Sequence, residues 1–120
     1  TQRNLYVGIT EVEAARIRTD LKNKYGMFVY KGILSEDYAI APKSTWADFV
    51  FSRNYNLKPL EEVESFIAEN EHLPDVPSAA QVAEEGYSQH DMNKVLLQKI
   101  EELTLYIIKQ QKEIDELKTR

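Results

Sequence analysis

The most regular pattern in this sequence is a repeat of apolar residues near its C-terminus. The repeat alternates steps of four and three residues and contains one polar position: Leu96, Ile100, Leu103, Ile107, Gln110, Ile114 and Leu117. Because an α-helix turns once every 3.6 residues, this spacing draws a narrow stripe along one side of a helix. Ser88 and Asp91 suit the start of such a helix, and no Gly or Pro follows them. The pattern predicts one helix of about 30 residues, roughly 45 Å long.

The stripe predicts self-association. In heptad notation the three Ile residues occupy position a, and the three Leu residues and Gln110 occupy position d. A lone helix with so narrow a stripe is only marginally stable in water, so it needs an equivalent stripe on another copy. Ile at a with Leu at d favours a parallel dimer, whereas Gln110 is a register-setting polar layer that trimers tolerate. The stripe alone leaves dimer and trimer open.

A second apolar set lies off the stripe and ends early, at Leu97, Leu105 and Ile108. We therefore expect the first half of the helix to be held between its own domain and neighbouring copies. The part beyond Lys109 is expected to protrude with only the stripe buried.

Two further helices are predicted before this one. Residues 59–70 place Pro59 at a helix start, with acidic residues in the first turn and an apolar face after it. The two prolines within residues 72–77 impose an extended turn. A short helix follows at about 78–86, where Ser78 and Gln81 form a capping box and Gly86 supplies a left-handed stop.

Residues 5–41 are expected to be mostly extended. Residues 5–10, 27–30 and 38–40 are rich in strand-forming residues. Residues 10–21 fit two structures. Thr10 and Glu13 resemble a capping box, and Ala14, Ile17 and Leu21 follow at helical spacing. However, Ile17, Thr19 and Leu21 also alternate with polar residues, as in a half-buried strand. We favour the strand, with residues 23–26 as the turn of a hairpin.

Residues 42–58 form an aromatic connector containing Trp46, Phe49, Phe51 and Tyr55. So much aromatic surface predicts a core plug between strands and helices. The alternative is a ligand platform, with Trp46, Tyr55 and Tyr87 as possible contacts. Together these elements predict an α+β chain divided into a β-rich, fibre-like region (1–45), a small α-rich domain (46–90) and an oligomerising helix (91–120).

Composition and charge narrow the function. The chain has 120 residues, a net charge of −5 and no cysteine. Nucleic-acid binding is disfavoured because basic residues are not clustered, and a disulfide framework is excluded. No apolar run is long enough to span a membrane, and residues 1–4 show no signal-peptide pattern. The missing initiator Met suggests a fragment of a longer protein.

No catalytic or cofactor site is predicted. His72 and His90 lack the ligand spacing of a zinc site, the carboxylates of residues 61–71 suit a solvated helix face, and the four glycines form no phosphate loop. We expect no enzyme activity, no metal and no cofactor.

Several segments resemble the C-terminal region of tail-fibre and cell-surface repeat proteins of the Bacteroidota. The resemblance spans about residues 28–117, with residues 31–36 as a leading strand, and is carried by residues 46–51 (WADFVF), 55–64 (YNLKPLEEVE), 72–78 (HLPDVPS) and 99–106 (KIEELTLY). The layout is similar to the intramolecular chaperone domain that ends endosialidase-type phage tail spikes. Such domains trimerise and template their fibre, and many then cut themselves off with a Ser-Asp nucleophile and a Lys.

This resemblance implies an extracellular homotrimer, on a virion tail fibre or a bacterial surface, that assembles with its own upstream fibre. Self-cleavage is not expected, because Ala47 precedes Asp48 where a hydroxyl would be needed, and Ser52 and Lys58 lack the matching spacing. The alternative function is a fibre tip that binds a host receptor or glycan.

Overall fold

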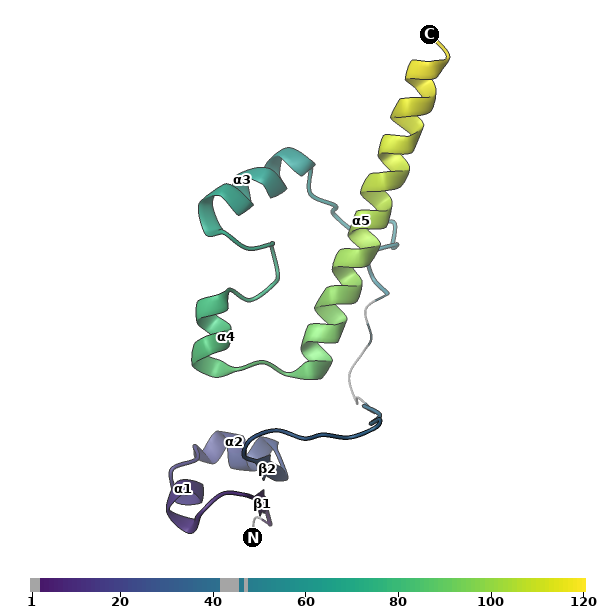
Figure 1. Cartoon of the computed structure of the whole chain (residues 1–120). Coiled ribbons are helices and arrows are strands. Elements are labelled where there is room, and N and C mark those ends of the chain that lie inside the picture. The colour runs from purple at the N-terminus through teal and green to yellow at the C-terminus, as the bar shows by residue number, and fades with distance from the viewer. Residues whose placement is uncertain (1–2, 42–45, 47) are drawn as a thin grey trace. The chain divides into compact units, whose positions relative to one another are not determined.

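The computed structural model describes residues 3–41, 46 and 48–120, and it divides the chain into two compact units, residues 1–39 and 40–120 (Figure 1). The first unit contains β1 (Leu5–Val7), α1 (Glu11–Ala15), α2 (Thr19–Lys24) and β2 (Met27–Val29). The second contains α3 (Leu60–Asn70), α4 (Ala79–Glu85) and α5 (Gln89–Lys118). Helices joined to a small sheet agree with the predicted α+β class.

The sheet of the first unit has two parallel strands. Tyr6 of β1 pairs with Phe28 of β2, and their rings stack with centroids 5.6 Å apart. Parallel strands cannot be joined by a tight turn, so the chain between them must cross over. Helices α1 and α2 make that crossover.

The strand favoured for residues 10–21 and the hairpin turn predicted at residues 23–26 are therefore wrong. The capping box at Thr10 is formed, since its Oγ1 accepts from the Glu13 N–H and the Glu13 carboxylate accepts from the Thr10 N–H, each at 3.1 Å. The helical spacing of this segment thus outweighs its strand-like alternation. Asn4, which precedes β1, also stabilises the helical conformation of this segment. Its side-chain amide donates to Lys22 O at 3.0 Å and to Tyr25 O at 2.8 Å, at the C-terminal end of α2, where the last carbonyls lack donors within the helix.

The strands expected at residues 31–36 and 38–40 are also wrong, since residues 30–41 form no strand. Lys31 and Gly32 have φ values of 78° and 105°, which break the extended backbone directly after β2. The first unit is consequently less β-rich than expected.

The helices of the second unit confirm the local signals. Pro59 precedes α3, and Ser78 and Gln81 form both hydrogen bonds of a capping box at α4. Gly86 follows α4 with φ 69° and ψ −165°, an extended conformation available essentially to glycine, rather than the expected left-handed helical one. Ser88 accepts from the Asp91 N–H and begins α5, which runs unbroken for 30 residues.

The predicted aromatic plug is wrong in its residues. Val50, 1% exposed, is the one fully buried hydrophobic side chain in the described ranges, whereas Trp46, Phe49 and Phe51 remain 40–58% exposed. Turn hydrogen bonds from Ser52 N and Tyr55 N fold residues 49–55 back on themselves, and within this segment the small Val50 is buried while Phe49 and Phe51 are not. None of the described helices is both long and apolar enough to cross a membrane.

Replacing Asn4 with Ala should destabilise the first unit. The change removes two hydrogen bonds to carbonyls at the end of α2, a loss of about 1–2 kcal/mol. Amide hydrogen exchange should show faster exchange at Met27–Val29. Arg3→Ala, which shortens the preceding exposed side chain, is the control, and equal protection in the two variants would contradict the role of Asn4.

Candidate functional site

The stripe on α5 is largely uncovered by its own chain. Its six apolar residues, from Leu96 to Leu117, are 46–62% exposed, and Gln110 between them is exposed too. Because α5 is continuous over 30 residues, the four-three spacing keeps all seven positions on one side. The structure thus displays the predicted stripe as one apolar surface.

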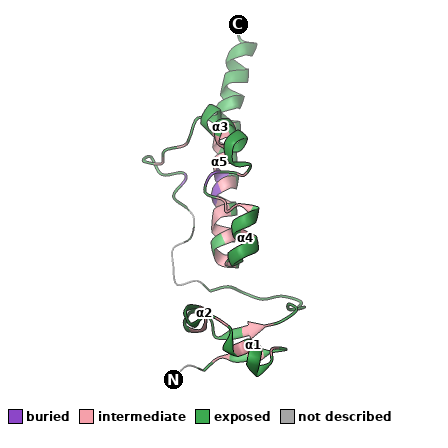
Figure 2. Ribbon diagram, turned by 90° about the vertical axis from the view of Figure 1, so that its left-hand side faces the viewer, coloured by how far each residue is buried: buried purple, intermediate pink, exposed green. Residues whose placement is uncertain are grey.

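The opposite side of the first half of α5 is covered by the rest of the second unit. Gln98 and Glu101 are 9% and 8% exposed, and Leu97 and Leu105 are half-buried. Tyr106 is the last residue with partial cover, and every residue from 107 to 120 is exposed (Figure 2). The second half of the helix protrudes as expected, although Ile108 is already 46% exposed. The expected contact of the first half with neighbouring copies stays a prediction.

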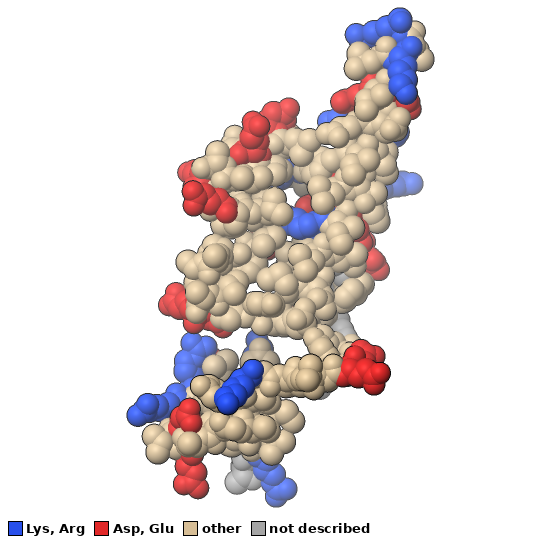
Figure 3. Space-filling model, in the orientation of Figure 1, with Lys and Arg blue, Asp and Glu red and all other residues tan. Residues whose placement is uncertain are grey.

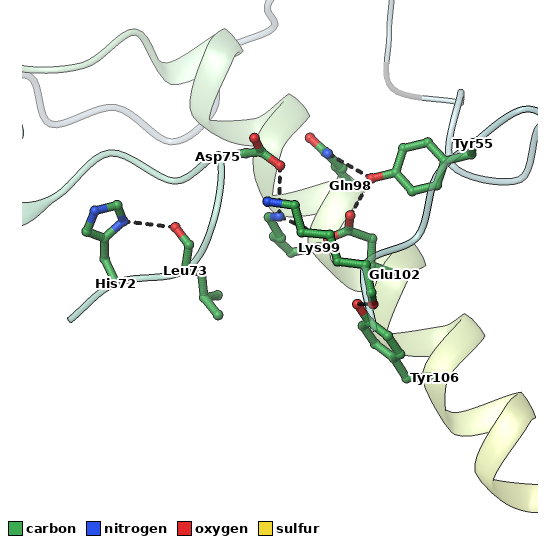
Figure 4. Close-up of polar contacts among 9 residues, drawn as sticks. Tyr55, His72, Leu73, Asp75, Gln98, Lys99, Glu102 and Tyr106 are labelled. Carbon is green, nitrogen blue, oxygen red and sulfur yellow. Dashed lines mark hydrogen bonds and ion pairs between the residues drawn. The ribbon is translucent and has the colours of Figure 1, made fainter. Parts of the chain in front are cut away.

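Polar contacts, rather than a large core, hold the covered half of α5. The Tyr55 hydroxyl donates to the Glu102 carboxylate and accepts from Gln98 Nε2 at 3.1 Å (Figure 4). Lys99 Nζ lies 2.9 Å from Glu102 Oε1 and 3.3 Å from Asp75 Oδ2. These contacts tie α5 to the aromatic connector and to the extended turn after α3.

A further hydrogen bond joins α5 to the segment before α3. The Tyr106 hydroxyl donates to Lys58 O at 2.6 Å. Tyr106 and Lys99 lie next to the stripe in heptad position g, so the rest of the second unit approaches α5 from that flank.

Burial shifts the tyrosine pKa values. Burial, with the hydrogen bond to Glu102 as the next cause, raises the pKa of Tyr55 to about 12. Burial and then the nearby Glu102 charge also raise the pKa of Tyr106. Both phenols are therefore neutral donors at physiological pH.

A groove of about 180 Å³ lies between α5 and the rest of the second unit. Its apolar walls come from several segments and include Tyr55, Leu60, Val63, Leu73, Leu103 and Tyr106. Leu103 belongs to the stripe, and Leu60 and Leu73 are each 43% exposed. The apolar surface of the stripe thus continues sideways onto α3 and the turn that follows it.

The residues predicted for ligand contact lie in different settings. Trp46 is 49% exposed and stacks on His90 with centroids 6.0 Å apart, while Tyr87 is 57% exposed. Tyr55 is engaged by Glu102 and Gln98. Within the described part of the chain no ring contact brings Trp46, Tyr55 and Tyr87 together.

The remaining candidates have local contacts. His72 Nδ1 lies 2.9 Å from Leu73 O, and its ring meets the edge of Phe66 at 5.3 Å. His90 lies in the first turn of α5, as expected. Lys58 Nζ stands 5.7 Å above the Phe66 ring and Ser52 Oγ accepts from the Asn54 N–H at 3.3 Å, whereas Ala47 lies outside the described residues.

The polar residues that anchor α5 were missed by sequence reasoning. Gln98, Lys99 and Glu102 lie off the stripe, where polar side chains ordinarily face water. Their partners Tyr55 and Asp75 are more than 20 residues away, so no local pattern marked them. Among the described residues, no three His, Asp or Glu side chains come together in a way that could hold a metal ion.

Replacing Tyr55 with Phe should loosen the attachment of α5. The change removes the hydroxyl shared by Glu102 and Gln98, which we expect to lower the free energy of unfolding by about 1–2 kcal/mol. Chemical denaturation followed by circular dichroism measures it. Tyr87→Phe, which alters an exposed side chain, is the matched control and should change stability little.

The same residue predicts a pH dependence. The folded chain keeps the Tyr55 proton up to a pKa of about 12, whereas an ordinary tyrosine releases it near 10. The unfolded chain therefore binds fewer protons in this range, and stability should fall as the pH rises from about 10 towards 12. Tyr55→Phe should flatten that decline, and an unchanged slope would show that Tyr55 is not its source.

No protein-family model matches the chain, and no match is found among curated proteins or solved structures. The exposed stripe and the contacts that position it are therefore the features that bear on function.

Proposed function

We propose that this chain is the C-terminal assembly module of a tail-fibre or cell-surface adhesin protein, in which α5 joins three copies. The observation that carries the proposal is the continuous heptad stripe, whose apolar side chains are 46–62% exposed in the single chain. Monomeric proteins rarely leave such a contiguous apolar surface in water. Other copies of α5 supply the matching stripe.

Burial of the stripe supplies a driving force of the size that association requires. Full burial of one Leu or Ile side chain contributes about 1.5–3 kcal/mol relative to full exposure. Six side chains that start about half exposed therefore offer on the order of 5–10 kcal/mol per copy. That gain is comparable to the cost of bringing chains together.

Three copies are favoured over two because the apolar surface is wider than the stripe. Leu60 and Leu73 border the same groove as Leu103, so neighbouring helices meet an apolar flank beside the stripe. The resemblance to trimerising fibre ends supports the same number and an extracellular location for the assembled protein.

The three joined α5 helices form a clamp, and this clamp acts as an intramolecular chaperone for the chain before it. The two-stranded sheet of the first unit is too small to be independently stable in water, and its Leu5, Val7 and Met27 side chains are 45–55% exposed. Joining three chains once, at their C-terminal helices, reduces the entropy cost of bringing further segments together. The upstream fibre is thereby assembled in register.

The double variant Ile100→Asp/Ile107→Asp should be monomeric, because it places two charges in the centre of each stripe. Sedimentation equilibrium at micromolar concentration should give the trimer mass for the parent chain and the single-chain mass for the variant. Lys112→Asp, on the opposite side of α5, is the control and should stay trimeric. A parent chain that sediments as a monomer with α5 folded would refute the proposal.

A receptor- or glycan-binding tip is the second candidate, favoured by Trp46. Its half-exposed ring is held against His90, which presents a fixed aromatic face. Trp46→Ala should abolish saturable binding on a glycan array while the mass in solution is unchanged. Tyr38→Ala, which removes another exposed aromatic ring, is the control, and absence of any saturable binding by the parent chain would count against this function.

A further inference from the structure

Some of the residues that flank the stripe already form hydrogen bonds or ion pairs within their own chain, and others do not. On one flank, position g holds Lys99, Tyr106, Glu113 and Arg120, and on the other, position e holds Leu97, Thr104, Gln111 and Lys118. In a coiled coil, the g residues of one helix face the e residues of its neighbour, and opposite charges at these positions set partner choice and orientation. The structure shows which of them remain available.

Four of the flanking residues, all of them before Glu113 in the sequence, are already engaged within the chain. Lys99 is bound by Asp75 and Glu102, and Tyr106 donates to Lys58 O. On the other flank, Thr104 donates to Ile100 O at 2.9 Å and Gln111 donates to Asp115 at 3.0 Å.

Glu113 and Lys118 are different. Both are exposed, and neither forms an ion pair with any residue that the structure describes; Arg120 on flank g is exposed and forms none among these residues either. Figure 3 shows blue Lys and Arg side chains at the C-terminal end of α5 with red Asp and Glu side chains close by, and Glu113 and Lys118 belong to this end of the helix.

We infer that neighbouring α5 helices pair in parallel and in register, with Glu113 of each copy forming an ion pair with Lys118 of the next. In a parallel pair, a g residue faces the e residue five positions later on the neighbouring helix, and that residue after Glu113 is Lys118. The two charges are opposite. This inference rests on the proposed self-association and adds its orientation and register.

Gln110 gives an independent reason for the same arrangement. In the parallel, in-register arrangement, Gln110 of each copy lies beside Gln110 of its neighbours, so their side-chain amides can donate to and accept from one another between the helices. The antiparallel alignment that overlaps the stripes most fully sets position a against position d, which places Gln110 against an Ile of the neighbour. A buried amide would then lack a partner, and that arrangement is disfavoured.

Cysteine cross-linking tests the orientation, because the chain contains no cysteine of its own. The full-length Leu117→Cys variant should form a disulfide with itself in a glutathione buffer, seen as a cross-linked dimer on a denaturing gel. A mixture of Ile100→Cys and Leu117→Cys chains should give only the two self-pairs, whereas an antiparallel alignment that sets position a against position d would bring these two residues together. A mixed disulfide joining the two variants would overturn the parallel orientation.

The same samples separate this inference from the proposed function. Monomeric mass with no disulfide would refute self-association itself, whereas trimeric mass with a mixed disulfide, or with no Leu117→Cys self-pair, would refute only the orientation.

Charge reversal tests the ion pair. Glu113→Lys should weaken association on the order of tenfold at low salt, because two positive charges would then face each other wherever this flank meets Lys118 of a neighbour. Adding Lys118→Glu in the same chain should restore association close to the parent value. Glu116→Lys, which changes the charge by the same amount away from the flanks, is the matched control. Equal weakening by Glu116→Lys, or failure of the second reversal to restore association, would overturn the pairing.

Discussion

The structure depends on a helix that continues well past the residues able to cover it. Cover by the rest of the second unit ends at Tyr106, and the remaining turns of α5 lie in water with a bare stripe. An isolated helical segment of about a dozen residues is only marginally stable, and its Ile and Leu side chains add exposed apolar surface. Under the proposed function, a helix in this position is one half of a contact whose other half is a neighbouring copy.

Within one copy, directional polar contacts do most of the positioning. Val50 is the single fully buried hydrophobic side chain among the described residues, whereas Tyr55, Lys99 and Tyr106 each bind a partner on another element. A typical hydrogen bond contributes only about 0.5–1.5 kcal/mol, but it fixes the orientation of the groups that it joins. The chain thus orients α5 with polar contacts, and under the proposed function the larger apolar contribution comes from neighbouring helices.

Local signals explain where prediction from sequence worked. Pro59, Ser78 and Ser88 act within a few residues of themselves, and the helices that they start were predicted within a residue or two. The hairpin prediction failed because the deciding contacts are remote: β1 pairs in parallel with β2, and Asn4 binds Lys22 O, 18 residues away. The stripe was predictable from its period, but the Tyr55 and Lys99 contacts were not, because residues that look solvent-facing on a helix carry no mark of a distant partner.

The position of the clamp also bears on the order of assembly. Helices form and pair through local contacts faster than strands that must find distant partners, so under the proposed function α5 associates before any upstream strand. Linked chains then meet at effective concentrations on the order of millimolar, which favours pairing within one assembly over pairing between assemblies. The exposed Leu5, Val7 and Met27 of the small sheet make that preference important, since open strand edges with apolar side chains otherwise invite aggregation. A parallel, in-register α5 bundle brings equivalent segments of all three chains out at the same end, which is the arrangement that a fibre of identical strands requires.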